Sequence, residues 1–412
     1  MRAPALIAVS LLLTLPASTA RAEPRWSKLN HQARAAIDAA DYPKLRATLL
    51  ELAPLMPGNA RTAYNLAATA AKLEDRPAAF AGVLALCEMG LTYNLGADED
   101  FAPLRGSTEF NDALACMKRN TAPVTHAHKW LTLAATDLLP EDLAFDPKSK
   151  RIFVSSIRKN LILEASGRIF ATTDLPVMAL AVDARRRILW ATVGWMPHCE
   201  SCAASDEGKT ALLAFNLDTR KVLRWISSAD PGLFGDMTIS RSGDVYVSEG
   251  LHGAVLRLPQ GAKTFERLDA AGEFPSPQQP ALSADEKTLY VPDHIRGIAA
   301  IDLASRAVTW LQPASGIALS GIDGLRLHGH SFYAVQNGTQ PARIIRFSLD
   351  LQTQEVLEAN WPGLGEPTHG LFIGDDYLFI ANTGWSEYDE HGKKREGSPP
   401  VTSEIWKLAT KE

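Results

Sequence analysis

The sequence predicts an α+β multidomain protein in which an N-terminal α-helical repeat domain precedes an all-β propeller of six blades. Three observations lead to this prediction. Residues 26–120 are dense in alanine and leucine and poor in β-branched residues, which favours helices. From residue 128 onward, short strand-like runs with turn signals replace the helical pattern. A pair of such runs then recurs six times with a period of about 45 residues, which is typical of propeller blades.

The size and composition of the chain fit two globular domains. Its 412 residues exceed one ordinary domain. Apolar residues make up 46% and charged residues 22%, as in soluble globular proteins. The formal net charge is −5, and no basic run stands out. We therefore expect neither nucleic acid nor an anionic membrane surface as a partner.

Residues 1–22 have the features of a signal peptide. Arg2 supplies a positive charge, Ala5 to Leu15 form an apolar core, and Pro16 interrupts it. The run Ala20-Arg-Ala22 then predicts cleavage before Glu23. A retained membrane anchor is the alternative, because anchors share such an apolar core. We expect the mature protein to be periplasmic or secreted, with no membrane span after cleavage.

Residues 23–122 are predicted to form the helical domain. Leu45, Leu49 and Leu52 fall at helical spacing, and the segments 57–59 and 74–77 interrupt the pattern. The resulting pairs of short helices are similar to degenerate tetratricopeptide repeats, whose period is about 34 residues. Such helices dock a protein partner or a neighbouring domain. A plain helical cap remains an equal alternative.

Residues 126–410 are predicted to form the propeller. An open β-sandwich would explain the strands but not their sixfold recurrence. The last strand, Glu404–Leu408, is expected to share a blade with the first, Lys129–Leu133, and so to close the ring. The six pairs of runs begin at Glu141 and Arg151, Met178 and Ile188, Gly235 and Val245, Gln278 and Leu289, Asp323 and Phe332, and His369 and Leu378.

The chain has four cysteines, which fit an oxidising compartment. Proximity along the chain makes the pairs Cys87–Cys116 and Cys199–Cys202 possible and favours a disulfide within the second pair, but it leaves the connectivity open. Ala203 stands where a haem-attachment motif needs histidine, and one Cys-x-x-Cys pair is weak evidence for zinc. The second pair lies in a long insertion that runs to about Gly208. This insertion, like the one at 385–400, has the length of a lid or binding loop.

The first residue of each repeat is expected to line one mouth of the propeller channel. These residues would bring two carboxylates, an amide and an imidazole to a common axis. Hard oxygen ligands of this kind suit Ca²⁺ or Mg²⁺, and we expect Ca²⁺. The aligned first positions are Glu141, Met178, Gly235, Gln278, Asp323 and His369, and the second positions add Asp142 and Asp236.

Two segments of these repeats resemble the SMP-30/gluconolactonase family, which includes proteins like luciferin-regenerating enzyme. They are Pro140–Asp146 and Ile322–Leu325, and the diffuse resemblance extends over residues 130–408. The family implies a six-bladed propeller with lactonase activity. It also implies a divalent metal held by a Glu, an Asn and an Asp, with the Asp acting as base towards water.

Carried onto this sequence, the resemblance implies Glu141 and Asp323 as metal ligands and Asp323 as the catalytic base. The family's Asn falls on Gln278, which keeps the amide oxygen but adds a methylene. A second family Asn, near substrate and metal, falls on Gly235, with Asp236 beside it. The predicted metal ligands are therefore Glu141, Gln278 and Asp323.

The remaining candidates concern substrate. His369 could bind metal, position substrate or act as a base near neutral pH. A channel histidine hydrogen-bonded to a neighbour is an equal alternative. Asp236, Asp293 and His369 are predicted to contact substrate, although for Asp293 an ordinary loop position is the commoner outcome.

Two functions follow from these predictions. The first is a metal-dependent hydrolase that acts on small lactones or related esters at the channel mouth. The second is a non-catalytic periplasmic binding or scaffold protein that uses its propeller and its tetratricopeptide-like repeats. The sequence contains no nucleophile elbow, phosphate-binding glycine loop or HExxH helix, which argues against common serine hydrolases, nucleotide enzymes and zinc proteases.

Overall fold

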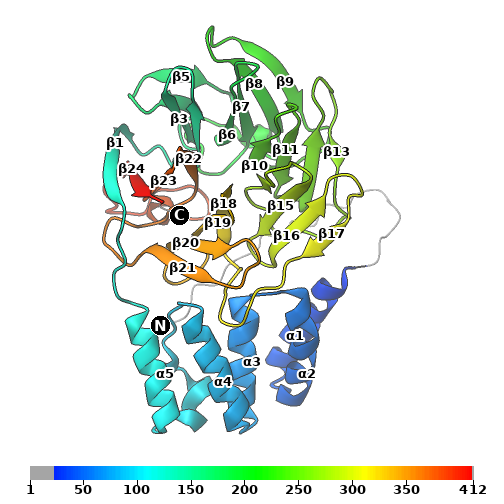
Figure 1. Ribbon diagram of the computed structural model, residues 1–412, viewed down its shortest axis with the longest axis vertical. Helices are drawn as coiled ribbons and strands as arrows, with labels where there is room; N and C mark the ends of the chain where they lie inside the picture. The colour runs from blue at the N-terminus through cyan, green and yellow to red at the C-terminus, as the bar shows by residue number, and fades with distance from the viewer. Residues whose placement is uncertain (1–22, 411–412) are drawn as a thin grey trace.

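The computed structural model describes residues 23–410 (Figure 1). The predicted signal peptide, residues 1–22, lies outside the described residues. Within residues 23–410, no helix is both long enough and apolar enough to cross a membrane. This part of the chain forms a helical region followed by a ring of six four-stranded sheets, so the predicted fold class is confirmed.

The helical region consists of short helices that pack side by side in chain order. Asp41, Asn59 and Asp75 cap three of them, because their side chains accept the backbone N–H three residues later. Their assignment to tetratricopeptide-like repeats stays a prediction. The elements are α1 (Arg25–Asp38), α2 (Tyr42–Leu52), η1 (Ala53–Leu55), α3 (Ala60–Lys72), α4 (Arg76–Glu88), η2 (Leu95–Ala97), η3 (Glu99–Leu104) and α5 (Thr108–Arg119).

The structure settles the connectivity of the cysteines, because both pairs that lie close along the chain form disulfides. Cys87–Cys116 joins α4 to α5, and Cys199–Cys202 closes a short loop in the second blade. The first bridge fixes the last helix of the region against its neighbour. The second bridge lies in the insertion that follows β7 (Ile188–Gly194).

Each blade is an antiparallel sheet whose strands follow the chain order, except in the last blade. Blades 1 and 2 contain β2 (Leu143–Asp146), β3 (Arg151–Ser156), β4 (Leu161–Glu164) and β5 (Ile169–Thr172), then β6 (Val177–Asp183), β7, β8 (Thr210–Asn216) and β9 (Val222–Ser227). Blades 3 and 4 contain β10 (Phe234–Ile239), β11 (Val245–Glu249), β12 (Ala254–Leu258) and β13 (Glu266–Arg267), then β14 (Ala281–Leu282), β15 (Thr288–Asp293), β16 (Gly297–Asp302) and β17 (Val308–Trp310). Blade 5 contains β18 (Ile322–His328), β19 (Ser331–Gln336), β20 (Arg343–Ser348) and β21 (Gln354–Ala359).

Blade 6 closes the ring. It consists of β22 (Gly370–Ile373), β23 (Asp376–Ile380), β24 (Thr402–Ala409) and β1 (His128–Thr136). β1 pairs with β24 in antiparallel register, with Lys129 opposite Trp406. The two ends of the propeller segment therefore share one sheet, as the sequence predicted. This closure pairs strands that would otherwise be open edges.

Apolar side chains fill the spaces between neighbouring blades. Ile298 of blade 4 and Phe332 of blade 5, for example, belong to one buried cluster. The second strands β3, β7 and β19 are buried on both faces along almost their whole length. The continuous apolar runs that predicted these strands therefore reflect burial between two adjacent sheets.

The helical region lies against blades 4 and 5, as the lower part of Figure 1 shows. The Asn59 side-chain amide donates to the Ile295 carbonyl, and the Ala60 N–H donates to the Ser320 hydroxyl. Ile295 lies in the loop between β15 and β16, and Ser320 lies just before β18. The helices are therefore docked at the end of the ring where the first strands of the blades begin.

Two buried arginines of the propeller hold this interface. Arg296, 4% exposed, donates through Nε and Nη2 to the Leu55 carbonyl at 3.2 Å. Arg343, fully buried, donates through Nη1 to the Met89 carbonyl at 2.7 Å. Both carbonyls are at helix C-termini, where they lack intrahelical partners and where a positive charge is favoured.

We predict that Arg343→Met loosens this interface, because the Met89 carbonyl loses a charge-assisted hydrogen bond in a buried place. The free energy of unfolding should fall by about 2–3 kcal/mol. Thermal unfolding and limited proteolysis of the segment between α5 and β1 would measure the effect. Arg346→Met on the same strand, where the partly exposed guanidinium pairs with Glu355, is the control. Equal melting temperatures for the two variants would contradict this role.

Candidate acidic site at the channel mouth

Three side chains from different blades meet at the channel mouth. Asp236 of blade 3, Asp323 of blade 5 and His369 of blade 6 each offer a ligand atom, and these atoms lie within 4.8 Å of one another. His369 Nε2 is 3.1 Å from Asp236 Oδ1 and 4.0 Å from Asp323 Oδ1. Asp236 and Asp323 occupy irregular positions in the pairing of β10 with β11 and of β18 with β19. Such bulges redirect a side chain out of the regular alternation.

His369 is fully buried, and its ring is held by blade 1. Its Nδ1 lies 2.8 Å from the Glu141 carbonyl, so Nδ1 carries the proton and donates to it. Nε2 makes no well-aligned hydrogen bond with any residue of the described chain. Burial opposes a charge on this ring, but the carboxylates of Asp236 and Asp323 outweigh it and raise the pKa of His369 well above its usual value.

Glu141 adds a third carboxyl group to this environment. Its Oε2 accepts a hydrogen bond from Trp385 Nε1 at 3.2 Å. Burial, followed by the negative charge of Asp323, raises the pKa of Glu141 to about 8. The structure therefore brings Glu141, Asp236, Asp323 and His369 of the predicted residues into one electrostatic neighbourhood.

Asp323 is positioned by a residue that the sequence reasoning did not identify as a site residue. Asn337, just after β19, donates from its side-chain amide to Asp323 Oδ2 at 2.7 Å. Burial raises the pKa of Asp323. Asp236 raises it further, whereas His369 opposes the shift. Asn337 is 14 residues from Asp323 in the chain, so this contact had no local signal in the sequence.

Gln279 is a second residue that the sequence reasoning missed. It is fully buried, and neither its amide oxygen nor its amide nitrogen has a hydrogen-bond partner among the described residues. Its backbone N–H donates to the Asp323 carbonyl at 3.2 Å, which places Gln279 beside Asp323. The sequence did contain one indication of this placement, because Gln279 is the second residue of its repeat, as Asp236 is in blade 3.

The predicted ligand Gln278 lies outside the three-residue cluster. Its side-chain nitrogen approaches Ser276 instead, at 3.1 Å from the hydroxyl oxygen. Asp293, predicted to contact substrate, ends β15 and accepts backbone N–H groups of Ser276, Ile295 and Arg296 at 2.7–2.9 Å. The structure therefore uses the Asp293 carboxylate to hold loops. Glu249 at the end of β11 likewise accepts a loop N–H group, whereas Ser156 and Gln336, which end β3 and β19, donate to loop carbonyls.

The two insertions meet over blades 1, 2 and 6. His198 of the first insertion packs edge-on against Trp385 of the second, with ring centroids 4.6 Å apart. The Arg158 guanidinium lies over the ring of Tyr388 in the second insertion, with its central carbon 4.9 Å from the ring centroid. Because Trp385 also binds Glu141, the two insertions form a roof that reaches the acidic site.

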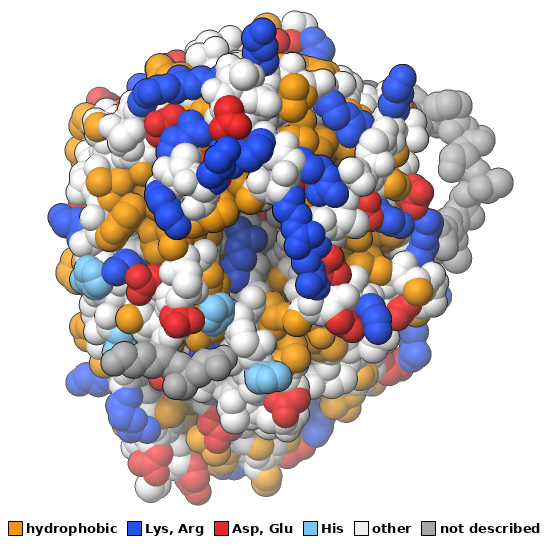
Figure 2. Space-filling view, turned by 45° about the horizontal axis from the view of Figure 1, so that its top comes forward, with side chains coloured by type: hydrophobic (Ala, Val, Ile, Leu, Met, Phe, Trp, Pro, Cys, Tyr) orange, Lys and Arg blue, Asp and Glu red, His pale blue; other side chains and the backbone are white. Residues whose placement is uncertain are grey.

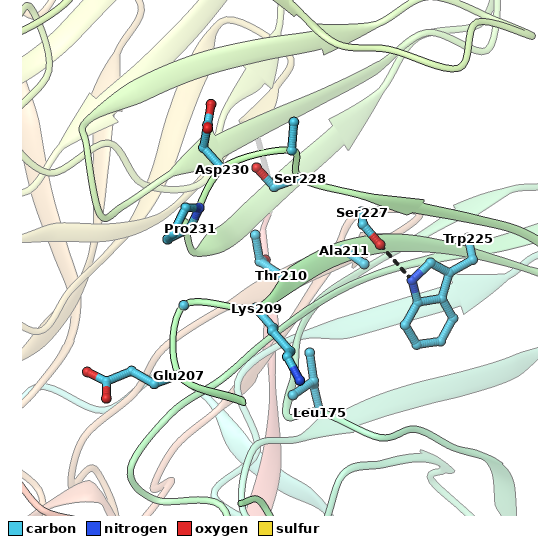
Figure 3. Close-up of a pocket in the computed structure, with 12 residues that line it drawn as sticks. Leu175, Glu207, Lys209, Thr210, Ala211, Trp225, Ser227, Ser228, Asp230 and Pro231 are labelled. Carbon is cyan, nitrogen blue, oxygen red and sulfur yellow. Dashed lines mark hydrogen bonds between the residues drawn. The ribbon is translucent and has the colours of Figure 1, made fainter. Parts of the chain in front are cut away.

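A separate surface pocket of about 280 Å³ lies beside blade 2 (Figure 3). Lys209, Trp225 and Asp230 are among the residues that line it. The Trp225 indole donates to Ser227 Oγ at 3.0 Å. The polar side chains of this pocket do not point towards a common centre in Figure 3. None of the residues of the acidic site lines the pocket.

No family model matches the chain, and no curated protein matches its sequence. Similar solved structures include a calcium-binding regucalcin from Agrobacterium tumefaciens, with 16% identity and a TM-score of 0.48, covering 68% of this chain and 93% of that one. A luciferin-regenerating enzyme has 13% identity and a TM-score of 0.45, covering 70% and 96%. A PQQ-bound aldose sugar dehydrogenase from Streptomyces coelicolor has 14% identity and a TM-score of 0.45, covering 69% and 99%.

We predict that the cation-free protein loses stability as the pH rises from about 5 to 8. Because the pKa of Glu141 is raised from 4.5 to about 8 by folding, the folded state keeps a proton that the unfolded state has lost. The free energy of unfolding therefore falls over the pH range in which the unfolded state has released this proton and the folded state still holds it. The raised pKa values of Asp323 and His369 act in the same direction.

Glu141→Gln should remove part of this loss, about 1–3 kcal/mol between pH 5 and pH 8. Urea denaturation in EDTA at several pH values would measure it. Glu396→Gln, which changes an exposed carboxylate of the second insertion, is the matched control. An unchanged pH slope in Glu141→Gln would show that Glu141 does not carry a proton in the folded protein.

Proposed function

We propose that the protein is an exported, divalent-cation-dependent hydrolase of lactones or related esters, with its site at the channel mouth. The observation that carries this proposal is the convergence of Asp236, Asp323 and His369 within 4.8 Å, with Glu141 nearby. The two disulfides of the described chain support export, since such bonds persist in oxidising compartments.

The residues present fit a divalent cation. Neighbouring carboxylates raise one another's pKa values when no positive ion lies between them. His369 Nε2 and the Gln279 amide oxygen are buried without a hydrogen-bond partner in the described chain. A cation held by Asp236, Asp323 and His369, with Glu141 close by, would satisfy this charge. The carboxylate majority favours Ca²⁺, while the imidazole also admits softer ions such as Mn²⁺ and Zn²⁺.

When bound, the cation would supply Lewis acidity that polarises an ester carbonyl. The protein's own residues supply the other functions of an ester hydrolase. Asp323, with its raised pKa and with Oδ2 fixed by Asn337, is suited to take a proton from water near neutral pH. The hydrogen bond from His369 Nδ1 to the Glu141 carbonyl would hold the ring so that Nε2 faces the cation. Trp385 and the roof around it would exclude bulk water.

Burial of the site supports a second candidate, the non-catalytic binding or scaffold protein. Asp236 is 5% exposed, Asp323 8% and His369 not at all. Substrate could reach these groups only if the roof moved. A structural cation held permanently at the ring axis would need no such movement.

The decisive experiment combines metal binding with hydrolysis. We expect Ca²⁺, Mg²⁺, Mn²⁺ or Zn²⁺ to raise the melting temperature of the EDTA-treated protein, since a ligand at a hundred times its Kd stabilises the folded state by about 2.7 kcal/mol. Asp323→Asn should abolish this shift. It should also lower the hydrolysis of simple aldonolactones and p-nitrophenyl esters by about a hundredfold or more.

Asp112→Asn, an exposed substitution on α5 with the same change of charge, is the control and should leave both properties intact. Metal-dependent stabilisation without hydrolysis would favour the non-catalytic candidate. The absence of stabilisation by all four ions would refute the cation site itself.

A further inference from the structure

The propeller channel continues beyond the acidic site as a cavity of about 390 Å³. The first strands of blades 1, 2, 3, 5 and 6 form its wall. Pro147 and Ala184, in the turns that follow β2 and β6, also line it. Because those strands run from the acidic site to these turns, the cavity opens at the opposite end of the ring from the helical region.

Most of the side chains that line this cavity are apolar, and backbone groups of the first strands also face it. Leu180, Ile239 and Phe372 are typical of its lining. Arg326 is the one charged side chain among the described lining residues, and Thr238 is the one other polar side chain. A volume of about 390 Å³ with apolar walls and few polar groups falls in the usual range for small-molecule sites, about 300–1,000 Å³.

Arg326 is held at the inner end of the cavity with unused hydrogen-bond donors. Its Nε donates to the Gly370 carbonyl at 2.8 Å, and the side chain is 21% exposed. Nη2 forms an ion pair with the buried Asp142 carboxylate, 3.7 Å from Oδ1, which is too long for a hydrogen bond. Neither terminal nitrogen of Arg326 has a hydrogen-bond acceptor among the described residues. A carboxylate is the partner that such a planar pair of donors binds best.

The rim of the cavity carries further positive charge. Lys148 and Lys150 lie in the turn between β2 and β3, and Arg185 lies in the turn between β6 and β7. All three are exposed and form no ion pair within residues 23–410. On the face of the propeller seen in Figure 2, Lys and Arg side chains lie near a hollow, with Asp, Glu and His side chains among them. Positive charges at the rim attract an anion towards the opening.

We propose that this end of the channel is a second binding site, for an apolar monocarboxylate of medium chain length. The carboxylate would bind the terminal nitrogens of Arg326, and the hydrocarbon chain would lie against the apolar wall. This site is distinct from the acidic site, and it does not depend on the proposed hydrolase activity. Negative charge at the acidic mouth would repel a carboxylate, so the ligand would enter from the basic rim.

Calorimetric titration of the full chain with decanoate, 1-decanol and decylamine tests the proposal. We expect decanoate to bind at least tenfold more tightly than decanol, because only decanoate makes charge-assisted hydrogen bonds. Decylamine should bind most weakly of the three. Decanoate affinity should be the same in EDTA and in Ca²⁺, which separates this site from the cation site. Equal affinities for decanoate and decanol, or no binding of decanoate, would overturn the proposal.

Arg326→Gln should lower the affinity for decanoate about tenfold or more and leave decanol unchanged. Lys263→Gln removes an exposed positive charge from the loop between β12 and β13, outside the cavity lining, and serves as the charge-matched control. Loss of decanoate binding in both variants would mean that general positive charge, and not Arg326, holds the ligand. The comparison of the three ligands on the unaltered protein decides the question even if Arg326→Gln does not fold.

Discussion

The pairing of β1 with β24 is the constraint on which the rest of the structure depends. It places the start of the propeller segment beside its end, with Lys129 opposite Trp406. Only a closed ring brings the first strands of blades 1, 3, 5 and 6 to a common axis. The acidic site has no local origin in the sequence, since Glu141 and His369 are 228 residues apart and meet through the Nδ1 hydrogen bond to the Glu141 carbonyl.

Ring closure also explains how the fold tolerates a cluster that is unfavourable by itself. Carboxylates gathered in a buried place repel one another and lose hydration, and both effects raise their pKa values. The apolar contacts between blades and the docking of the helical region offset this cost. If the proposed cation binds there, its positive charge would remove this repulsion and stabilise the ring. Side chains with strongly shifted pKa values are common at functional sites.

The blade pattern could be predicted from the sequence because apolar runs and turns are local, whereas the exact set of side chains that meets at the channel mouth could not. Asp323 and His369 stand at the predicted first position of their repeats and reach the cluster. In blade 3 the corresponding residue is Gly235, and Asp236, one residue later, reaches it through an irregularity in β10. The spacing of the repeat does not reveal such a bulge. Nor does it reveal that backbone N–H groups already occupy the Asp293 carboxylate.

The cover over the channel mouth indicates how a substrate would approach the acidic site. The helical region occupies blades 4 and 5, and the two insertions occupy blades 1, 2 and 6. Blade 3 is left with the short loop between β11 and β12, where Leu251 is 58% exposed and His252 is exposed too. The backbone of Phe274 packs against Gly253 at the end of this loop, whereas Leu251 and His252 stay exposed. An approach over blade 3 would lead directly to Asp236, and it would need only a small movement of the roof at Trp385, because the docked helices could stay in place.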